Sequence, residues 1–212
     1  MTSALDEIKV VDLTRTLAGP FCTMMLGDMG AEVTKIEEPK LGDETRSWTP
    51  FWNDEGTQFL TFNRNKRRLS LNLKEQEGID IILSLVKDAD VMISSIRPAA
   101  LARLSLDPET LRRAYPDLIT VSATGFGQDG PYAAKPAFDD SVQSVSGLAS
   151  LATLRDPGVP PAYAPTILAD KLGGVTAAYA VMGALFHRER TGEAQHVEVP
   201  MFETLAAFLL IE

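Results

Sequence analysis

Residues 8–37 read IKVVDLTRTLAGPFCTMMLGDMGAEVTKIE. Two short apolar runs, over 8–13 and 31–37, predict strands, and the segment between them predicts a helix over 20–29. Pro20 suits the first turn of that helix and Gly30 suits its C-terminal end. Strand, helix and strand in this succession are typical of an α/β fold.

The same alternation continues along the chain. Further strands are predicted over 67–73, 90–95, 118–124 and 194–201, and further helices over 75–87, around 108–114, over 139–151 and over 167–190. This pattern predicts an α/β, doubly wound, Rossmann-like open parallel sheet. Ligands of such sheets bind at the carboxyl ends of the strands, so the loops after Leu13, Leu73, Ser95 and Thr124 are the candidate site.

The composition excludes several classes of protein. The chain has 212 residues, of which 45% are hydrophobic and 23% charged, as in ordinary globular domains. No apolar run reaches the roughly 18 residues of a membrane span, and no signal peptide is recognisable. We therefore expect a cytoplasmic protein without a membrane partner. The net charge of -9 argues against nucleic acid as a partner.

Asp170 is the acid that the pattern singles out, because it lies in an otherwise small and apolar helical stretch. It is either a functional carboxylate or an acid that the dipole of the first helical turn stabilises. Gly173 and Gly174 fit the close approach of a ligand, or tight helix packing. The basic segment NRNKRR, residues 63–68, is either a site for anionic groups or a solvated loop. The single cysteine excludes an internal disulfide, and neither histidine has metal-ligand spacing, so no metal site is expected.

Several segments together resemble one family. They are LTRTLAGPFCTMMLGDMGAEVTKIEEPKLGDETR, NRNKRRLSLNLK, VSATGFGQDGPY, ILADKLGGVTAAYAVMGALFHRERTGEAQHVEV and MFET. In their order and spacing they resemble the class III coenzyme A transferases of the CaiB/BaiF type. This group includes formyl-CoA and carnitine CoA-transferases and the 2-methylacyl-CoA racemases.

The resemblance implies a catalytic nucleophile at Asp170. In the family, this carboxylate attacks an acyl-CoA to give a mixed anhydride and then an aspartyl-CoA thioester, and CoA passes to a carboxylic acid acceptor. CoA is thus a substrate, and no permanently bound cofactor is expected. The resemblance implies CoA contacts from Arg15, Thr16, Leu17, Ala18, Leu71, Asn72, Leu73, Lys74, Ser95, Ile96, Arg97 and Arg103. Candidate substrate-side residues are Phe138, Asp139 and Gly173, and candidate walls of the acyl pocket are Trp48, Phe51 and Trp52.

Two alternatives to a transferase remain open. The racemases of this family place a histidine where this chain has Phe138, which favours a transferase over a racemase, although Asp139 and Asp140 follow. The third possibility is an inactive CoA-binding half that needs a partner chain. Family members are about twice as long, so we expect residues 1–200 to form the N-terminal portion of a CoA-binding α/β domain. Residues 201–212 would then begin a linker helix toward a second domain. The expected assembly is an interlocked homodimer, or a complex with a complementary C-terminal half.

Overall fold

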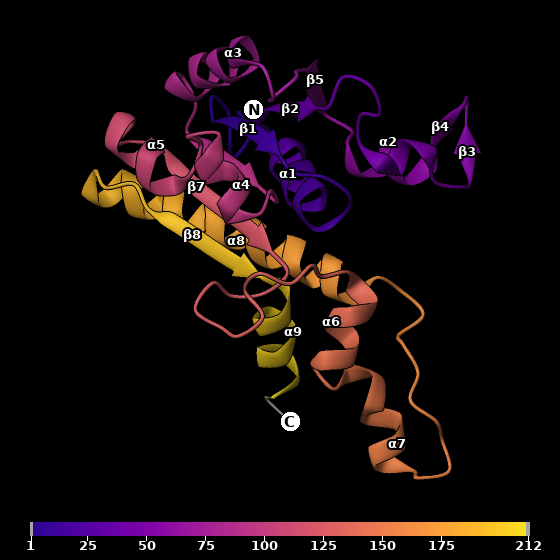
Figure 1. Cartoon of the computed structure of the whole chain (residues 1–212). Coiled ribbons are helices and arrows are strands. Elements are labelled where there is room, and N and C mark those ends of the chain that lie inside the picture. The colour runs from indigo at the N-terminus through magenta and orange to yellow at the C-terminus, as the bar shows by residue number, and fades with distance from the viewer. Residues whose placement is uncertain (1, 211–212) are drawn as a thin grey trace.

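The computed structural model describes residues 2–210 and places a six-stranded parallel sheet at the centre of that range (Figure 1). The order of its strands is β5-β2-β1-β6-β7-β8, and all neighbours run parallel. The bounds are β1 Lys9–Leu13, β2 Glu32–Glu37, β5 Lys66–Ser70, β6 Val91–Ser94, β7 Ile119–Thr124 and β8 His196–Pro200. The predicted doubly wound sheet is confirmed. Its winding reverses between β1 and β6, where such sheets bind ligands.

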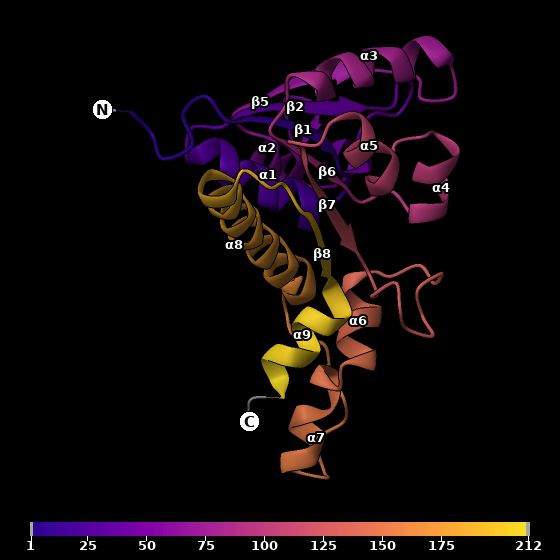
Figure 2. The ribbon, with the colours of Figure 1, turned by 90° about the vertical axis from the view of Figure 1, so that its left-hand side faces the viewer.

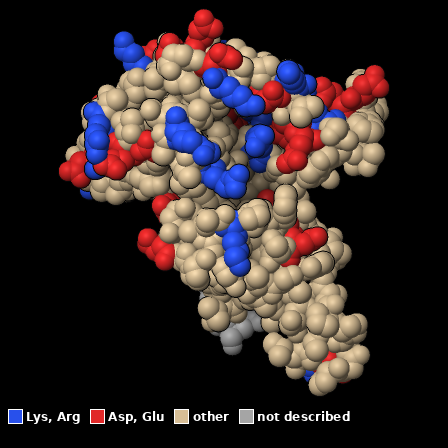
Figure 3. All heavy atoms as spheres, in the orientation of Figure 1, with Lys and Arg blue, Asp and Glu red and all other residues tan. Residues whose placement is uncertain are grey.

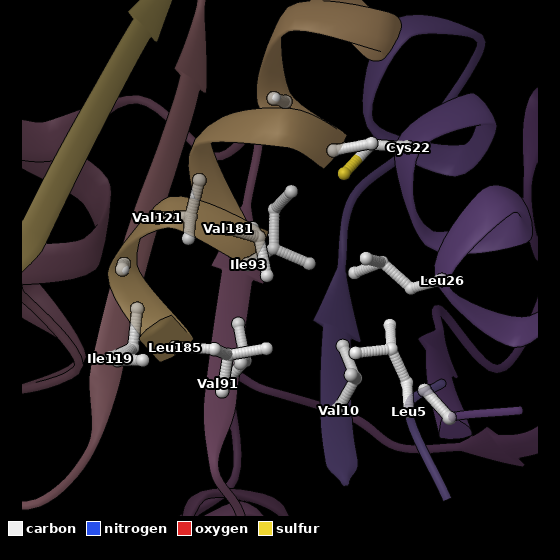
Figure 4. Close-up of a cluster of buried hydrophobic side chains, with 14 of the residues drawn as sticks. Leu5, Val10, Cys22, Leu26, Val91, Ile93, Ile119, Val121, Val181 and Leu185 are labelled. Carbon is white, nitrogen blue, oxygen red and sulfur yellow. The ribbon is translucent and has the colours of Figure 1, made fainter. Parts of the chain in front are cut away.

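Helices cover both faces of the sheet, because parallel strands are buried on both sides (Figure 2). One face carries α1 (Ala18–Asp28) and α8 (Leu168–Thr191). The other carries α3 (Gln76–Lys87), α4 (Pro98–Arg103) and α5 (Pro108–Ala114). Each face has its own cluster of buried apolar side chains. Figure 4 shows the cluster under α1 and α8, where Cys22 packs as a small apolar residue.

Two groups of smaller elements extend beyond the sheet (Figure 1). Between β2 and β5 lie a 3-10 turn (Glu44–Ser47), the hairpin of β3 (Phe51–Trp52) and β4 (Glu55–Gly56), and α2 (Thr57–Phe62). Beyond the carboxyl ends of β7 and β8 lie α6 (Asp139–Val145), a 3-10 turn (Leu148–Ser150), α7 (Leu151–Arg155) and α9 (Met201–Leu209). The helix α9 packs with α6 and α8 around Val142, Ala169 and Leu205.

Most predicted elements are found within a few residues of their predicted bounds, and two differ. The helix predicted over 139–151 is broken, because Gly147 adopts a φ of 87° and ends α6. The strand predicted over 67–73 ends at Ser70, so LNL lies in the loop that follows it. The helix predicted to begin at 201 is confirmed as α9, and residues 211–212 of that segment lie outside the described residues. The division of the chain at residue 200 stays a prediction.

Within residues 2–210, no helix combines the length and apolarity that a membrane crossing requires.

Candidate active site

A cleft of about 520 Å³ opens at the carboxyl ends of the strands, where the sheet reverses its winding. Its walls come from the loop after β1, the loop after β6, the segment after β7 and the start of α8. Lining residues that the sequence also singles out are Arg15, Thr16, Leu17, Ala18, Ser95, Ile96, Arg97, Phe138 and Asp170. On the face shown in Figure 3, Lys and Arg side chains gather around a hollow near the middle of the molecule.

Asp170 lies at the meeting point of two helix N-termini. It belongs to the first turn of α8, and its Oδ1 accepts a hydrogen bond of 3.2 Å from the backbone N–H of Ala18. Ala18 is the first residue of α1, so the carboxylate also lies at the positive end of that helix. The cleft therefore contains a carboxylate together with a backbone N–H that donates a hydrogen bond to it.

The pKa of Asp170 is raised from its ordinary 3.8 to about 6. Burial is the main cause and the nearby carboxylate of Asp139 adds to it, whereas the hydrogen bond from Ala18 acts in the opposite direction. A carboxyl group with a pKa near 6 is mainly ionised at neutral pH and is less well solvated than an exposed one. Both properties favour a nucleophilic carboxylate.

Asp139 supports the start of α8 from the first turn of α6. Its Oδ1 accepts from the backbone N–H of Asp170 at 3.1 Å, and its Oδ2 accepts from the side-chain amide of Gln143. Gln143 is fully buried, and its Oε1 accepts from the backbone N–H of Ala164 at 2.8 Å. Through these bonds α6 fixes the turn that carries Asp170. Asp139, predicted as a substrate-side residue, is therefore engaged in holding α8.

The other predicted CoA contacts do not line this cleft. Leu71 is buried in the core under α3, whereas Asn72 and Lys74 are exposed beyond β5. Arg103 is the last residue of α4. A CoA-binding role for Leu71, Asn72, Leu73, Lys74 and Arg103 stays a prediction. Of the four predicted loops, the one after Leu73 therefore lies outside the cleft. This loop follows β5, which is an edge strand of the sheet and is separated from β1 by β2.

The two glycines after Asp170 lie in tight packing. A Cβ on Gly174 would be 2.7 Å from the backbone oxygen of Ala18, and one on Gly173 would be 3.2 Å from the Met201 side chain. For Gly174 this favours the helix-packing interpretation, since it lets α1 approach α8 closely. The substrate-side role of Gly173 stays a prediction.

The basic segment 63–68 and the predicted walls of the acyl pocket do not line this cleft. Arg64, Lys66 and Arg67 of the basic segment pair with the carboxylates of Asp28, Asp12 and Glu32, so these charges are balanced within the chain. Trp48, Phe51 and Trp52 are absent from the lining of the cleft, and their role as walls of an acyl pocket stays a prediction. Phe51 and Trp52 are mostly exposed on the β3–β4 hairpin, which extends beyond the sheet (Figure 1).

Sequence reasoning missed Lys35, Asp43 and Asp12, whose buried side chains lie behind the loop after β1. The burial of Lys35 could have been predicted from its position, because its side chain points to the same face of the strand as Val33, which is a core residue. It also missed Gln128, Lys135 and Met201, which line the cleft. Among residues 2–210, no three His, Cys, Asp or Glu side chains gather closely enough to hold a metal ion.

Comparison with known proteins places the chain in a family. The model of CoA-transferase family III matches residues 5–211. The chain is 42% identical to an acetyl-CoA:oxalate CoA-transferase of Acetobacter aceti, over 96% of this chain and 52% of that protein. It is 39% identical to a succinyl-CoA:glutarate CoA-transferase of Mus musculus, over 97% of this chain and 47% of that protein.

Solved structures agree with the sequence comparison. The crystal structure of a CaiB/BaiF family protein from Brucella suis superposes with a TM-score of 0.93 at 35% identity, over 99% of this chain and 56% of that one. The chain thus spans about half the length of the curated relatives it matches. On this evidence the chain belongs to CoA-transferase family III.

Proposed function

We propose that this chain carries the nucleophile of a CoA transferase, which moves coenzyme A from an acyl-CoA donor to a carboxylic acid acceptor. The observation that carries the proposal is the carboxylate of Asp170, half-buried in the cleft and hydrogen-bonded to the N-terminus of α1. The names of the two relatives, which pair acetyl-CoA with oxalate and succinyl-CoA with glutarate, support this class of substrates.

The proposed reaction begins when the Asp170 carboxylate attacks the carbonyl carbon of the donor thioester. The C–S bond breaks, CoA leaves as the thiolate, and a mixed anhydride joins the donor acyl group to Asp170. The thiolate then attacks the aspartyl carbonyl carbon, which releases the donor acid as its carboxylate and leaves an aspartyl-CoA thioester. CoA remains activated in this intermediate while the first acid departs.

The acceptor reverses these two steps. Its carboxylate attacks the aspartyl thioester, which expels the CoA thiolate and forms a second mixed anhydride. The thiolate attacks the acceptor's acyl carbon, which yields the new acyl-CoA and restores the Asp170 carboxylate. No net proton is taken up or released, and each bond broken is matched by one formed.

Other residues of the cleft fit supporting roles. The N–H of Ala18 is placed to donate to negative charge that develops on an oxygen of Asp170. Arg15, Arg97 and Lys135 line the cleft and supply positive charge suited to the phosphates of CoA. Lys135 also lies over the ring of Tyr132, with its Nζ 4.0 Å from the ring centroid.

A transferase is favoured over a racemase. Exchange of an α-proton needs an acid and a base on opposite sides of the carbon. Phe138 has no acidic or basic group. The carboxylate of Asp139 already accepts hydrogen bonds from the backbone N–H of Asp170 and from the side-chain amide of Gln143.

The proposed activity belongs to an assembly larger than these 212 residues, because the match covers about half of each relative. We infer that the remaining half completes the site, either in a full-length interlocked homodimer or as a complementary chain.

The test is acyl trapping at Asp170. This chain, assembled with the half that completes its site, is incubated with acetyl-CoA or succinyl-CoA and hydroxylamine, and its mass and peptides are analysed for an aspartyl hydroxamate or a CoA adduct. We expect the modification at Asp170, and its loss in Asp170→Ala. The matched control is Asp140→Ala, which removes an exposed carboxylate from α6. Modification that persists in Asp170→Ala, or its absence from the wild-type assembly with both donors, would contradict the proposal.

A further inference from the structure

A buried ion pair lies directly behind the loop that joins β1 to α1, residues 14–17. Lys35 of β2 and Asp43, which follows β2, have side chains without solvent exposure, and Nζ lies 2.9 Å from Oδ2. Lys35 Nζ also donates to the backbone oxygen of Thr14 at 2.8 Å. Asp43 Oδ2 accepts from the backbone N–H of Thr16 at 3.3 Å. The pair therefore contacts the loop at two of its residues.

The loop needs such contacts because its backbone is strained. Thr16 adopts a φ of 71°, in the left-handed region that β-branched residues rarely occupy. A strained residue persists only where its surroundings hold it. Besides the bond to Asp43, the Thr16 hydroxyl donates to Glu44, and the N–H of Arg15 donates to Ser95 Oγ at 3.0 Å.

Stability alone does not account for the pair. Removing two charges from water costs several kcal/mol each, and well-packed apolar residues of similar volume are often as stable or more so. Lys35 is among the largest fully buried side chains of the described residues, in a strand whose neighbours Val33 and Ile36 are apolar core residues. The charges are thus placed where an apolar side chain would fit, and their hydrogen bonds run to the loop.

We propose that Lys35 and Asp43 are positioning residues, which hold the 14–17 loop so that the N–H of Ala18, the residue after it, is directed at the carboxylate of Asp170. Three hydrogen bonds support this proposal. Lys35 donates to Thr14 and Thr16 donates to Asp43, which holds the loop, and Ala18, the residue after the loop, donates to Asp170. The catalytic consequence rests on the proposed function, whereas the effect on the Asp170 carboxyl does not.

The test uses the double variant Lys35→Met/Asp43→Asn, which removes both charges at similar volume and leaves no single buried charge behind. We expect the pKa of Asp170, followed by NMR of its carboxyl carbon, to rise above its wild-type value, because the hydrogen bond from Ala18 that lowers it is loosened. Burial and Asp139, the other influences on this pKa, are left in place. Amides of residues 14–18 should exchange about tenfold faster or more, and acyl trapping at Asp170 should slow by about tenfold or more.

The matched control is Arg188→Met/Asp90→Asn. It removes another ion pair, 2.6 Å long and partly buried, between the C-terminal part of α8 and the residue before β6. This pair lies at the amino ends of the strands, so the Asp170 pKa, loop exchange and trapping should stay at wild-type values. Should the double variant fail to fold, Lys35→Gln/Asp43→Asn also removes both charges, keeps polar groups near Thr14 and Thr16, and should raise the pKa less.

The outcomes separate the two proposals. An unchanged Asp170 pKa and unchanged exchange over 14–18 would overturn the positioning role, and so would equal changes in the control. A wild-type chain that cannot be trapped, but whose Asp170 pKa responds to the double variant, would remove the proposed reaction and retain the positioning role.

Discussion

The two faces of the sheet bury different kinds of side chain. Under α3, α4 and α5 the interior consists of apolar side chains, such as Ile82, Leu106 and Leu111, and of neutral hydroxyl groups from Ser94, Thr120 and Ser122. Under α1 and α8, apolar residues share the interior with Asp12 and Lys35, which oppose each other across β1 and β2. Since successive residues of a strand point to opposite faces, one strand serves both environments. Both faces, the apolar one under α3, α4 and α5 and the mixed one under α1 and α8, bury apolar side chains that stabilise the sheet, whereas the buried strand charges Asp12 and Lys35 lie on the mixed face.

A truncation on the apolar face should cost the most stability. Ile82→Ala removes a fully buried side chain from α3, and the free energy of unfolding should fall by about 2–5 kcal/mol because a cavity remains. Denaturant unfolding measures the loss. The Asp170 pKa should stay at its wild-type value, since α3 lies across the sheet from the cleft. A shifted Asp170 pKa would show that the two faces are not independent.

A substitution where α1 packs against α8 on the mixed face should have a smaller effect on stability. Gly174→Ala places a Cβ 2.7 Å from the backbone oxygen of Ala18, which must push α1 from α8. We expect a loss of about 1–3 kcal/mol and slower acyl trapping at Asp170. The control is Gly183→Ala on the same helix, where nothing lies within 4 Å. That variant should gain about 0.5–1 kcal/mol from helix propensity, and equal losses for both would refute the packing explanation.

The third prediction concerns pH. The folded state raises the pKa of Asp170 to about 6, so it binds the proton more tightly than the unfolded chain does. The associated stability is complete below the unfolded pKa near 4 and is lost as the pH rises through about 6. Asp170→Asn should therefore be more stable than the wild type at pH 8, by about 1–2 kcal/mol, and this advantage should vanish toward pH 4.

Denaturant unfolding at several pH values measures this profile, with Asp140→Asn as the control for losing one negative charge. An advantage of Asp170→Asn that is independent of pH, or shared by the control, would contradict the explanation from the raised pKa. Acyl trapping by the wild type should rise with pH through about 6 in the same series, because the proposed nucleophile is the ionised form of this carboxyl.

The sequence predicts the sheet well because its signals are local. Short apolar runs, Pro20 and Gly30 each depend on a few neighbouring residues. The cleft is predicted in part, since the loops after Leu13, Ser95 and Thr124 meet there. That meeting follows from the general rule for parallel sheets.

The buried ion pairs depend on strand order and register, which no local pattern carries. The pairing of Asp12 with Lys66 joins β1 to a strand two positions away, and that of Lys35 with Asp43 needs the path of the chain after β2. For the same reason the basic segment 63–68 could be identified from sequence, whereas its carboxylate partners could not. Such contacts become visible when distant parts of the chain are brought together.

The hydrogen bond between Ala18 and Asp170 spans 152 residues of chain, which has a consequence for biosynthesis. Chains emerge from the ribosome N-terminal end first, at about 5–20 residues per second. The first strands and α1 are therefore made well before α8, and until that last long helix docks, Asp170 is an ordinary hydrated acid. The nascent polypeptide thereby acquires its proposed nucleophile late, and acyl trapping at Asp170 would report that α8 has docked on α1.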